Sequence, residues 1–270
     1  MIRCFVGAKD AFLHREGISD FVAFDTNIFV QEKLKEYILD KPFQILLLTG
    51  EPGAGKTCTA EKVVDDLGDE KCYFQKYPFS TIVSFLGTLH AHFLPTVALP
   101  KPYTREALLE SLREHLSKDF VPTVIIDEIQ LYKDYELEII RMLSDTRLFR
   151  FVFILHKLER ETLLSQSYFV SRTWGKLELK ALTLKECEFF ISQKLLHHGL
   201  GALQERFGKK QYALLYRFSR GNLRVLCKLC YTTLEICEYY EEHTPSKLAR
   251  RRIPVQFIEM AALDLGVLHE

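Results

Sequence analysis

A glycine-rich loop that ends in a lysine and a hydroxyl carries the clearest chemistry in this chain. Gly50–Thr57 reads Gly-Glu-Pro-Gly-Ala-Gly-Lys-Thr, the spacing of a phosphate-binding loop. In such a loop, backbone N–H groups surround phosphate oxygens and the following helix N-terminus adds partial positive charge. We expect Lys56 to reach the β- and γ-phosphates and Thr57 to bind Mg²⁺, whereas the alternative is an ordinary glycine turn before a helix. The residues expected to contact nucleotide are Gly50, Glu51, Pro52, Gly53, Ala54, Gly55, Lys56, Thr57 and Cys58.

Two adjacent acids could complete this site. Thr123-Val-Ile-Ile-Asp-Glu128 is an apolar strand pattern that ends in Asp127 and Glu128. In phosphate-loop enzymes an acid at this place helps to hold Mg²⁺, so we assign Asp127 to the metal. A second acid can orient and polarise the attacking water, which we assign to Glu128. Acids are also common in surface turns after strands, but together with the glycine loop they predict hydrolysis of ATP with Mg²⁺.

The elements around these motifs predict an α/β fold. Apolar strand patterns alternate with helical patterns from Gln44 to about Leu182, which is typical of a parallel sheet with helices on both faces. The predicted strands are Gln44–Leu48, Cys72–Lys76, Thr123–Ile126, Phe149–Leu155 and Lys176–Leu179. The predicted helices are Val30–Leu39, Thr57–Leu67, Phe79–Phe93, Thr104–Lys118, Tyr135–Ser144 and Glu159–Ser165.

After Leu182 the pattern becomes entirely helical. Thr183-Leu-Lys-Glu186 forms a capping box that opens a helix ending near His197. Further helices are predicted at Lys209–Arg217, Leu223–Glu241 and Pro254–Leu263. We therefore expect two domains: a P-loop core over residues 1–182, with 1–28 as an N-terminal extension, and a small helical lid over 183–270.

Composition favours a cytoplasmic protein. The chain has 36 Lys and Arg against 36 Asp and Glu, and this zero net charge argues against a protein built mainly to coat nucleic acid. No apolar run approaches the ~18 residues of a membrane span, and the N-terminus lacks a signal-peptide pattern. The seven cysteines are expected to be free thiols. Cys227 and Cys230 could suggest zinc or redox chemistry, but their apolar, helix-period surroundings favour buried core cysteines.

These motifs resemble the AAA+ ATPases of the ExeA/MshM/TniB group. The carrying residues are the Gly-Glu-x-Gly-x-Gly-Lys-Thr loop and Asp127-Glu-Ile-Gln130, followed by a leucine-spaced helix through Arg141-Met-Leu-Ser144. The resemblance runs from about Phe29 to Gly266. It implies an AAA+ core with a helical lid and ATP bound between them.

The resemblance also implies three further nucleotide-site residues. His156, at the end of the strand after the acid pair, aligns with a polar sensor residue that is usually glutamine. Arg172 stands at the place of an arginine finger, which would reach a neighbouring subunit's site. Arg224 in Gly221-Asn-Leu-Arg matches the second sensor, with Asn222 as the helix cap. Ordinary alternatives are a hydrogen-bonded strand-end histidine, a surface arginine paired with a nearby acid and an exposed helix arginine.

The resemblance leaves the client of the ATPase open. We expect a homo-oligomer, as a ring or filament, that serves protein components of a secretion, type IV pilus or DNA-uptake machine, either in the cytoplasm or peripherally at the inner membrane. The alternative is a DNA-binding regulator of transposition or replication, and a third interpretation is an ATP-bound scaffold. DNA binding is not favoured, because the charge is neutral and one short basic cluster, Lys247–Arg252, is more often a solvated loop.

Overall fold

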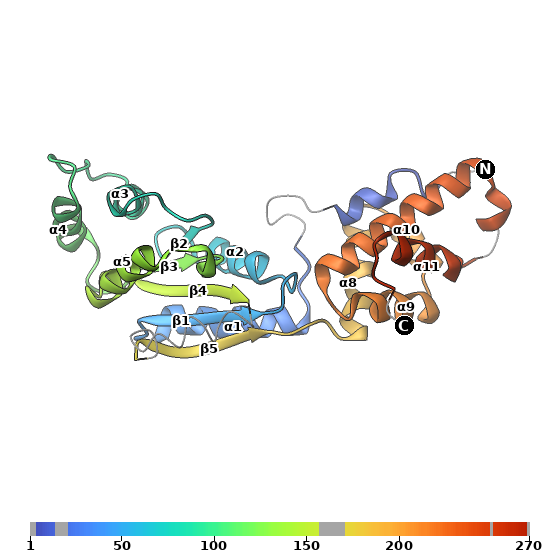
Figure 1. Ribbon diagram of the computed structural model, residues 1–270, viewed down its shortest axis with the longest axis horizontal. Helices are drawn as coiled ribbons and strands as arrows, with labels where there is room; N and C mark the ends of the chain where they lie inside the picture. Colours follow the sequence, from blue (N-terminus) through green and yellow to red (C-terminus); the bar gives the residue numbers. More distant parts are fainter. Residues whose placement is uncertain (1–3, 14–20, 157–170, 249–250, 269–270) are drawn as a thin grey trace. The chain divides into compact units, whose positions relative to one another are not determined.

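The computed structural model describes residues 4–13, 21–156, 171–248 and 251–268. Its contacts divide the chain into two units, whose elements are labelled in Figure 1. A sheet unit holds Phe29–Gly50 and Lys56–Leu179, and a helical unit holds Lys180–Glu270 with Met1–Ile28 and Glu51–Gly55. The predicted helix at Glu159–Ser165 lies outside the described residues.

Five parallel strands form the centre of the sheet unit. The strands are β1 (Ile45–Gly50), β2 (Cys72–Gln75), β3 (Thr123–Ile126), β4 (Arg150–His156) and β5 (Thr173–Leu179). Their order is β2-β3-β4-β1-β5, so β1 lies between β4 and β5. Every residue of β1 is buried, as its unbroken apolar run predicts. In the pairing of β1 with β4, Gly50 stands opposite His156.

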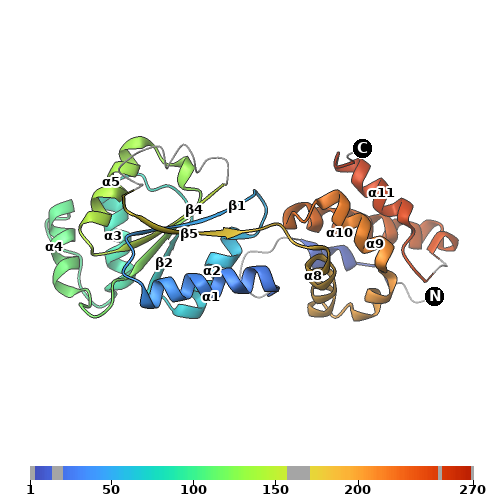
Figure 2. The same ribbon diagram turned by 90° about the horizontal axis from the view of Figure 1, so that it is seen from below.

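Helices cover both faces of this sheet. The covering helices are α1 (Asp25–Asp40), α2 (Lys56–Leu67), α3 (Ile82–Phe93), α4 (Arg105–His115) and α5 (Asp134–Asp145). Alternate strand residues such as Ile45, Leu47 and Phe153 pack in one cluster with α3, α4 and α5. Figure 2 shows α1 and α2 together on one face. The predicted α/β core is therefore confirmed.

Helix α3 begins three residues later than its apolar pattern predicts. Thr81 is the N-cap, and its side chain accepts a hydrogen bond from the Ser84 N–H. Phe79, which precedes the cap, stacks on Phe85 instead of entering the helix. The apolar pattern thus begins before the helix does, because a residue that precedes the N-cap can still pack on the first turns of the helix.

The helical unit has a separate hydrophobic core. It contains η1 (Ala8–Phe12), α8 (Leu184–His197), η4 (Gly201–Arg206), α9 (Lys209–Ser219), α10 (Leu223–His243), η5 (Pro245–Leu248) and α11 (Val255–Asp264). The predicted capping box at Thr183 and Glu186 opens α8. Of the helices that the structure describes, none is both long and apolar enough to cross a membrane.

The N-terminal segment contributes directly to this helical core. Phe5, Phe12 and Phe24 are buried in the same cluster as residues of α8, α9 and α10. The backbone N–H groups of Cys4 and Phe5 donate to the carboxylate of Glu241 at 2.9 Å each. By its contacts, residues 1–28 therefore group with 180–270, whereas the sequence pattern places them as an extension of the core.

Candidate functional site

The carboxyl ends of three neighbouring strands bring together the polar residues singled out in the sheet unit. Gly50 ends β1, His156 ends β4 beside it, and Asp127 and Glu128 follow β3 directly. Lys56 begins α2 after the glycine-rich loop. In parallel α/β sheets, this edge is where ligands bind.

Lys56 is a buried lysine whose charged end has two polar neighbours. The residue is 6% exposed. The ammonium donates to the backbone carbonyl of Gly50 at 3.1 Å and lies 3.2 Å from Nδ1 of His156. The loop thus turns its lysine back over its own first residue, so that a cation is ready where phosphate would bind.

Thr57 and Asp127 form a candidate pair of metal ligands. The Thr57 hydroxyl donates to Asp127 Oδ2 at 2.8 Å. Burial raises the pKa of Asp127 above its ordinary value, although hydrogen bonds from Thr57 and the Glu128 N–H act in the opposite direction. Carboxylate and hydroxyl oxygens suit Mg²⁺, which keeps several water ligands and often binds through few protein groups and substrate phosphates. Within the described residues no group of three or more His, Cys, Asp or Glu could hold a metal ion.

Glu128 is connected to Lys56 through His156. Glu128 Oε2 lies 3.2 Å from His156 Nε2 and also accepts from the Gln130 side chain. Because the Lys56 ammonium can only donate, His156 Nδ1 must accept, and Nε2 then carries the proton donated to Glu128. The histidine therefore links the candidate water-orienting carboxylate to the candidate phosphate-binding ammonium. The sequence pattern identifies all three residues, but not this connection.

The backbone of Glu128 is unusual. Its φ of 47° and ψ of 47° place it in the left-handed region, which few residues other than glycine adopt. Its carbonyl accepts from the Leu131 N–H at 2.8 Å, which closes the short helix η3 (Ile129–Leu131). Strained residues of this kind concentrate at functional sites. Here the turn directs the chain out of β3 directly after the acid pair.

In the helical unit, the middle of the glycine-rich loop contacts the start of α10. The side chain of Asn222 caps this helix through the Val225 N–H at 3.1 Å, as predicted, and its amide donates to Pro52 O at 2.6 Å. The Arg224 N–H donates to Gly53 O at 3.2 Å. A side chain at Gly53, where φ is 79°, would stand 2.6 Å from Asn222 Oδ1 and 2.8 Å from the Arg224 Cβ. Only glycine fits this close approach. The backbone of the exposed residue Arg224 thus lies directly beside the loop.

A pocket adjoins this loop. The residues that line it are Glu51, Pro52, Ala54, Ala181, Phe218, Ser219, Arg220, Asn222, Val225 and Val267. Most of them present apolar surface, and the Asn222 amide, the Ser219 hydroxyl and the Glu51 carboxylate add hydrogen-bonding groups. Such a mixture suits a flat heteroaromatic ring.

Comparison with known proteins agrees with this geometry. Residues 40–164 match the family model of an AAA domain. An ORC chain from Drosophila, in a complex with DNA, superposes with a TM-score of 0.66 at 13% identity, and the match covers 97% of this chain and 66% of that chain. The chain has the P-loop AAA+ fold. No curated protein sequence matches it significantly.

Archaeal proteins share the AAA+ fold with this chain. Cdc6p from Pyrobaculum aerophilum superposes with a TM-score of 0.60 at 14% identity, over 95% of this chain and 70% of that one. The ORC1 protein from Aeropyrum pernix, in complex with DNA, gives 0.61 at 15% identity, over 95% and 69%. The AAA+ prediction is supported, while the resemblance to the ExeA/MshM/TniB group stays a prediction.

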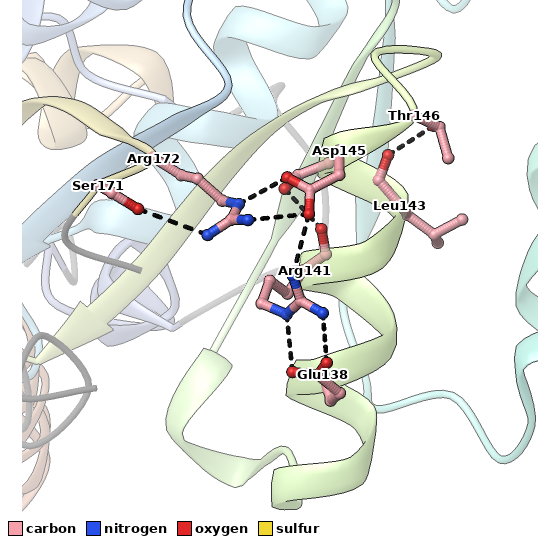
Figure 3. Close-up of polar contacts among 8 residues, drawn as sticks. Glu138, Arg141, Leu143, Asp145, Thr146, Ser171 and Arg172 are labelled. Atoms are coloured by element: carbon pink, nitrogen blue, oxygen red, sulfur yellow. Dashed lines mark hydrogen bonds and ion pairs between the residues drawn. The ribbon is translucent and has the colours of Figure 1, made fainter. Parts of the chain in front are cut away.

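Arg172, the finger candidate of the AAA+ sheet unit, is engaged in a local array of ion pairs. Its guanidinium donates to both carboxylate oxygens of Asp145, at 2.6 and 2.9 Å. Figure 3 shows the two side chains facing each other from the turn before β5 and the end of α5, with Arg141 bridging Asp145 and Glu138. Arg172 therefore contacts Asp145 and does not join the group around Lys56. A finger that acts on another subunit is also expected to lie away from the site of its own subunit.

The basic cluster at Lys247–Arg252 is mostly occupied by structural contacts. Arg251 pairs with Glu205 at 2.8 Å, and Arg252 donates to the backbone carbonyls of Glu205 and Phe207. Lys247 lies over the ring of Tyr240 at 4.6 Å. Arg250 lies outside the described residues. The described cations of this cluster therefore hold the segment before α11 against the end of η4, and η5 against α10.

Cys227 and Cys230 have the environment of core residues. Both are free thiols on α10, and Cys230 is completely buried. Burial raises the pKa of the Cys230 thiol well above its ordinary value. The interpretation as a core cysteine is confirmed for Cys230, whereas Cys227 is half-buried against the same core.

Proposed function

We propose that this protein is an ATPase that hydrolyses ATP to ADP and phosphate with the help of Mg²⁺. The observation that carries the proposal is the gathering of Lys56, the Thr57–Asp127 pair and Glu128 at one edge of the sheet. This arrangement supplies a cation for phosphate, oxygen ligands for a divalent metal and a carboxylate for water. A scaffold that only binds ATP would not need the last of these.

Each residue contributes by position and charge. The Lys56 ammonium would neutralise phosphate oxygens, and Thr57 and Asp127 would hold Mg²⁺ by their oxygens. A metal held there would supply positive charge against the negative charge of phosphoryl transfer. Glu128 accepts a hydrogen bond from the attacking water, and His156 keeps its carboxylate oriented. Orientation and electrostatic stabilisation of this kind supply most of the catalysis of phosphoryl transfer.

The pocket beside the glycine-rich loop suits the adenine base. Pro52 and Val225 offer apolar surface, and the Arg220 guanidinium and the second N–H of the Asn222 amide offer hydrogen-bond donors. Arg224 starts next to the loop, which supports a role as second sensor of the phosphates. We further propose that the active form is a homo-oligomer in which Arg172 acts on the neighbouring subunit.

Substitution of Lys56 and Glu128 separates binding from hydrolysis. Lys56→Ala is expected to weaken ATP binding by about 10- to 100-fold, because charged hydrogen bonds contribute about 1.5–3 kcal/mol. Glu128→Gln is expected to bind ATP normally but to lower phosphate release by at least ~10²-fold, the usual contribution of such a base. Isothermal titration and a phosphate-release assay measure the two effects.

Lys62→Ala is the matched control, because Lys62 lies on the same helix as Lys56 and, among the described residues, pairs with Asp65 and Asp66 at the surface. It should leave both binding and hydrolysis unchanged. Hydrolysis at the normal rate by Glu128→Gln would remove Glu128 from the water-orienting role. Normal ATP affinity of Lys56→Ala would contradict the proposed phosphate site.

DNA is a second candidate for what the ATPase acts on. The Drosophila ORC and Aeropyrum ORC1 structures that share its fold were both solved with DNA. This likeness supports a DNA-directed switch. The secretion, pilus or DNA-uptake machine expected from the sequence resemblance has no support in the comparisons and stays a prediction.

A further inference from the structure

A stretch of the helical unit has a strongly unbalanced charge. The segment Lys209–Leu234 contains no Asp or Glu, although the whole chain has equal numbers of acids and bases. It covers α9, the following turn and the first half of α10. Its cations are Lys209, Lys210, Arg217, Arg220, Arg224 and Lys228. Arg220 and Arg224 adjoin the candidate nucleotide pocket, and we call the other four the basic face.

All of these cations are exposed to solvent. The buried side of α9 consists of Gln211, Tyr212, Leu215, Phe218 and Ser219. At 3.6 residues per turn, Lys209, Lys210 and Arg217 lie on the opposite side, and Arg220 follows at the helix end. Arg224 and Lys228 are one turn apart on the exposed side of α10.

The basic face lacks internal neutralisation. Among the residues that the structure describes, none of its four side chains forms an ion pair, and Arg217 lies over the ring of Phe218, at 4.8 Å. Three of the four acids in the second half of α10 are used elsewhere. Glu235 and Glu238 pair with Lys9, and Glu241 accepts from the N-terminal backbone. The fold thus leaves the positive charge of this surface available to an external anion.

We propose that the basic face binds the phosphate backbone of DNA. Exposed cations on two successive helices suit a polyanion such as DNA, and neutralising its phosphates releases counterions. An anionic membrane is a poorer fit, because interfacial helices also present large apolar side chains. The exposed position between the α9 cations is Ala213. This inference rests on the DNA-directed candidate function and is independent of ATP hydrolysis.

The test is the salt dependence of binding to a fluorescein-labelled duplex DNA of arbitrary sequence, with the full chain and a non-hydrolysable ATP analogue. The variant replaces Lys209, Lys210, Arg217 and Lys228 with Gln. Arg220 and Arg224 are left intact, because they adjoin the candidate nucleotide pocket. If all four cations contact phosphates, the slope of log K against log salt should decrease by about 3 to 4, and affinity in dilute buffer should drop more than ~10-fold.

The matched control replaces Lys33, Lys41, Lys71 and Arg105 with Gln. These removed charges pair with surface carboxylates of Glu36, Glu70 and Glu106. It should keep the DNA affinity and salt slope of the unmodified protein, and both variants should keep the circular dichroism spectrum and the ATPase rate measured without DNA.

Three results would overturn the inference. An equal loss in the control would show that only total charge matters. Full binding by the basic-face variant would place the DNA surface elsewhere while preserving a DNA-directed role. If the unmodified protein does not bind DNA, or binds phosphatidylserine vesicles and not DNA, the DNA-directed role is excluded. The ATPase proposal is tested separately, by the Lys56 and Glu128 variants.

Discussion

At the scale of single residues, the partner of Arg172 decides what this arginine can do. Its guanidinium forms a two-point pair with Asp145, whose side chain is 39% exposed (Figure 3). Exposed ion pairs contribute only about 0–1 kcal/mol, so such a pair can open when a better anion is offered. The fork of donors that fits a carboxylate also fits phosphate oxygens. The observed contact is therefore compatible with a finger that leaves Asp145 on assembly.

Two substitutions distinguish a finger from a structural ion pair. Arg172→Ala should lower kcat by ~10³-fold or more while ATP affinity stays normal, because arginine fingers contribute 10³–10⁵ in rate. Asp145→Asn removes the same ion pair but keeps the guanidinium, and should change kcat by less than ~5-fold. Phosphate release at several protein concentrations measures both. Equal losses in the two variants would mean that Arg172 serves only the ion pair.

At the scale of elements, one carboxylate fastens the start of α8. Glu186 accepts from the N–H and hydroxyl of Thr183, at 2.8 and 2.9 Å, and from the N–H of Thr26 at 2.9 Å. Burial opposes its ionisation, but these hydrogen bonds outweigh burial and lower the pKa of Glu186 below its ordinary value of 4.5. The charged form is thus favoured in the folded protein.

This lowered pKa makes the stability of the fold dependent on pH. The stabilisation of the fold by ionised Glu186 is fully present at pH values above the ordinary pKa. It is lost as pH falls through the lowered pKa of the folded state, because the unfolded chain takes up the proton first. Glu186→Gln should therefore reduce the free energy of unfolding at neutral pH by about 0.5–2 kcal/mol, the usual effect of losing a cap. At pH values below both pKa values the difference should shrink. Glu188→Gln, an exposed change on the same helix, is the control for urea unfolding at both pH values; an equal loss there would contradict the role of the cap.

At the scale of the whole molecule, the chain forms two units with separate cores. The helical core includes residues from both ends of the sequence, since Phe5 packs with residues of α8 to α11. Phe5 is completely buried, and the guanidinium of Arg206 lies 5.4 Å from the centre of its ring. The N-terminal segment is thus a structural part of the helical unit.

Truncating this residue should destabilise the protein. Phe5→Ala is expected to cost about 3–5 kcal/mol, as for other buried phenylalanines. Val6→Ala is the matched neighbour: Val6 is 57% exposed and should change stability by less than ~0.5 kcal/mol. Chemical denaturation monitored by circular dichroism measures both changes. A small effect of Phe5→Ala would mean that this segment only lies on the surface of the unit.

Much of the fold follows from local patterns in the sequence. The strand Thr123–Ile126, the cap at Thr183 and the cap at Asn222 lie where the patterns predict. Caps and buried strands depend mainly on neighbouring residue types, so short stretches are sufficient to identify them. The glycine-rich loop and the acids after the third strand are of the same kind, and together they predicted the phosphate chemistry.

Tertiary structure decided which of these residues meet. Gly50 and His156 stand opposite each other through strand register, and that pairing brings the histidine to Lys56 and Glu128. Contacts across the fold neutralise Arg251 but leave the cations of α9 without ion pairs among the described residues. The sequence by itself determined the residue types and local elements, whereas packing of distant segments determined partners and available charges, because neither register nor burial is visible in a short window of sequence.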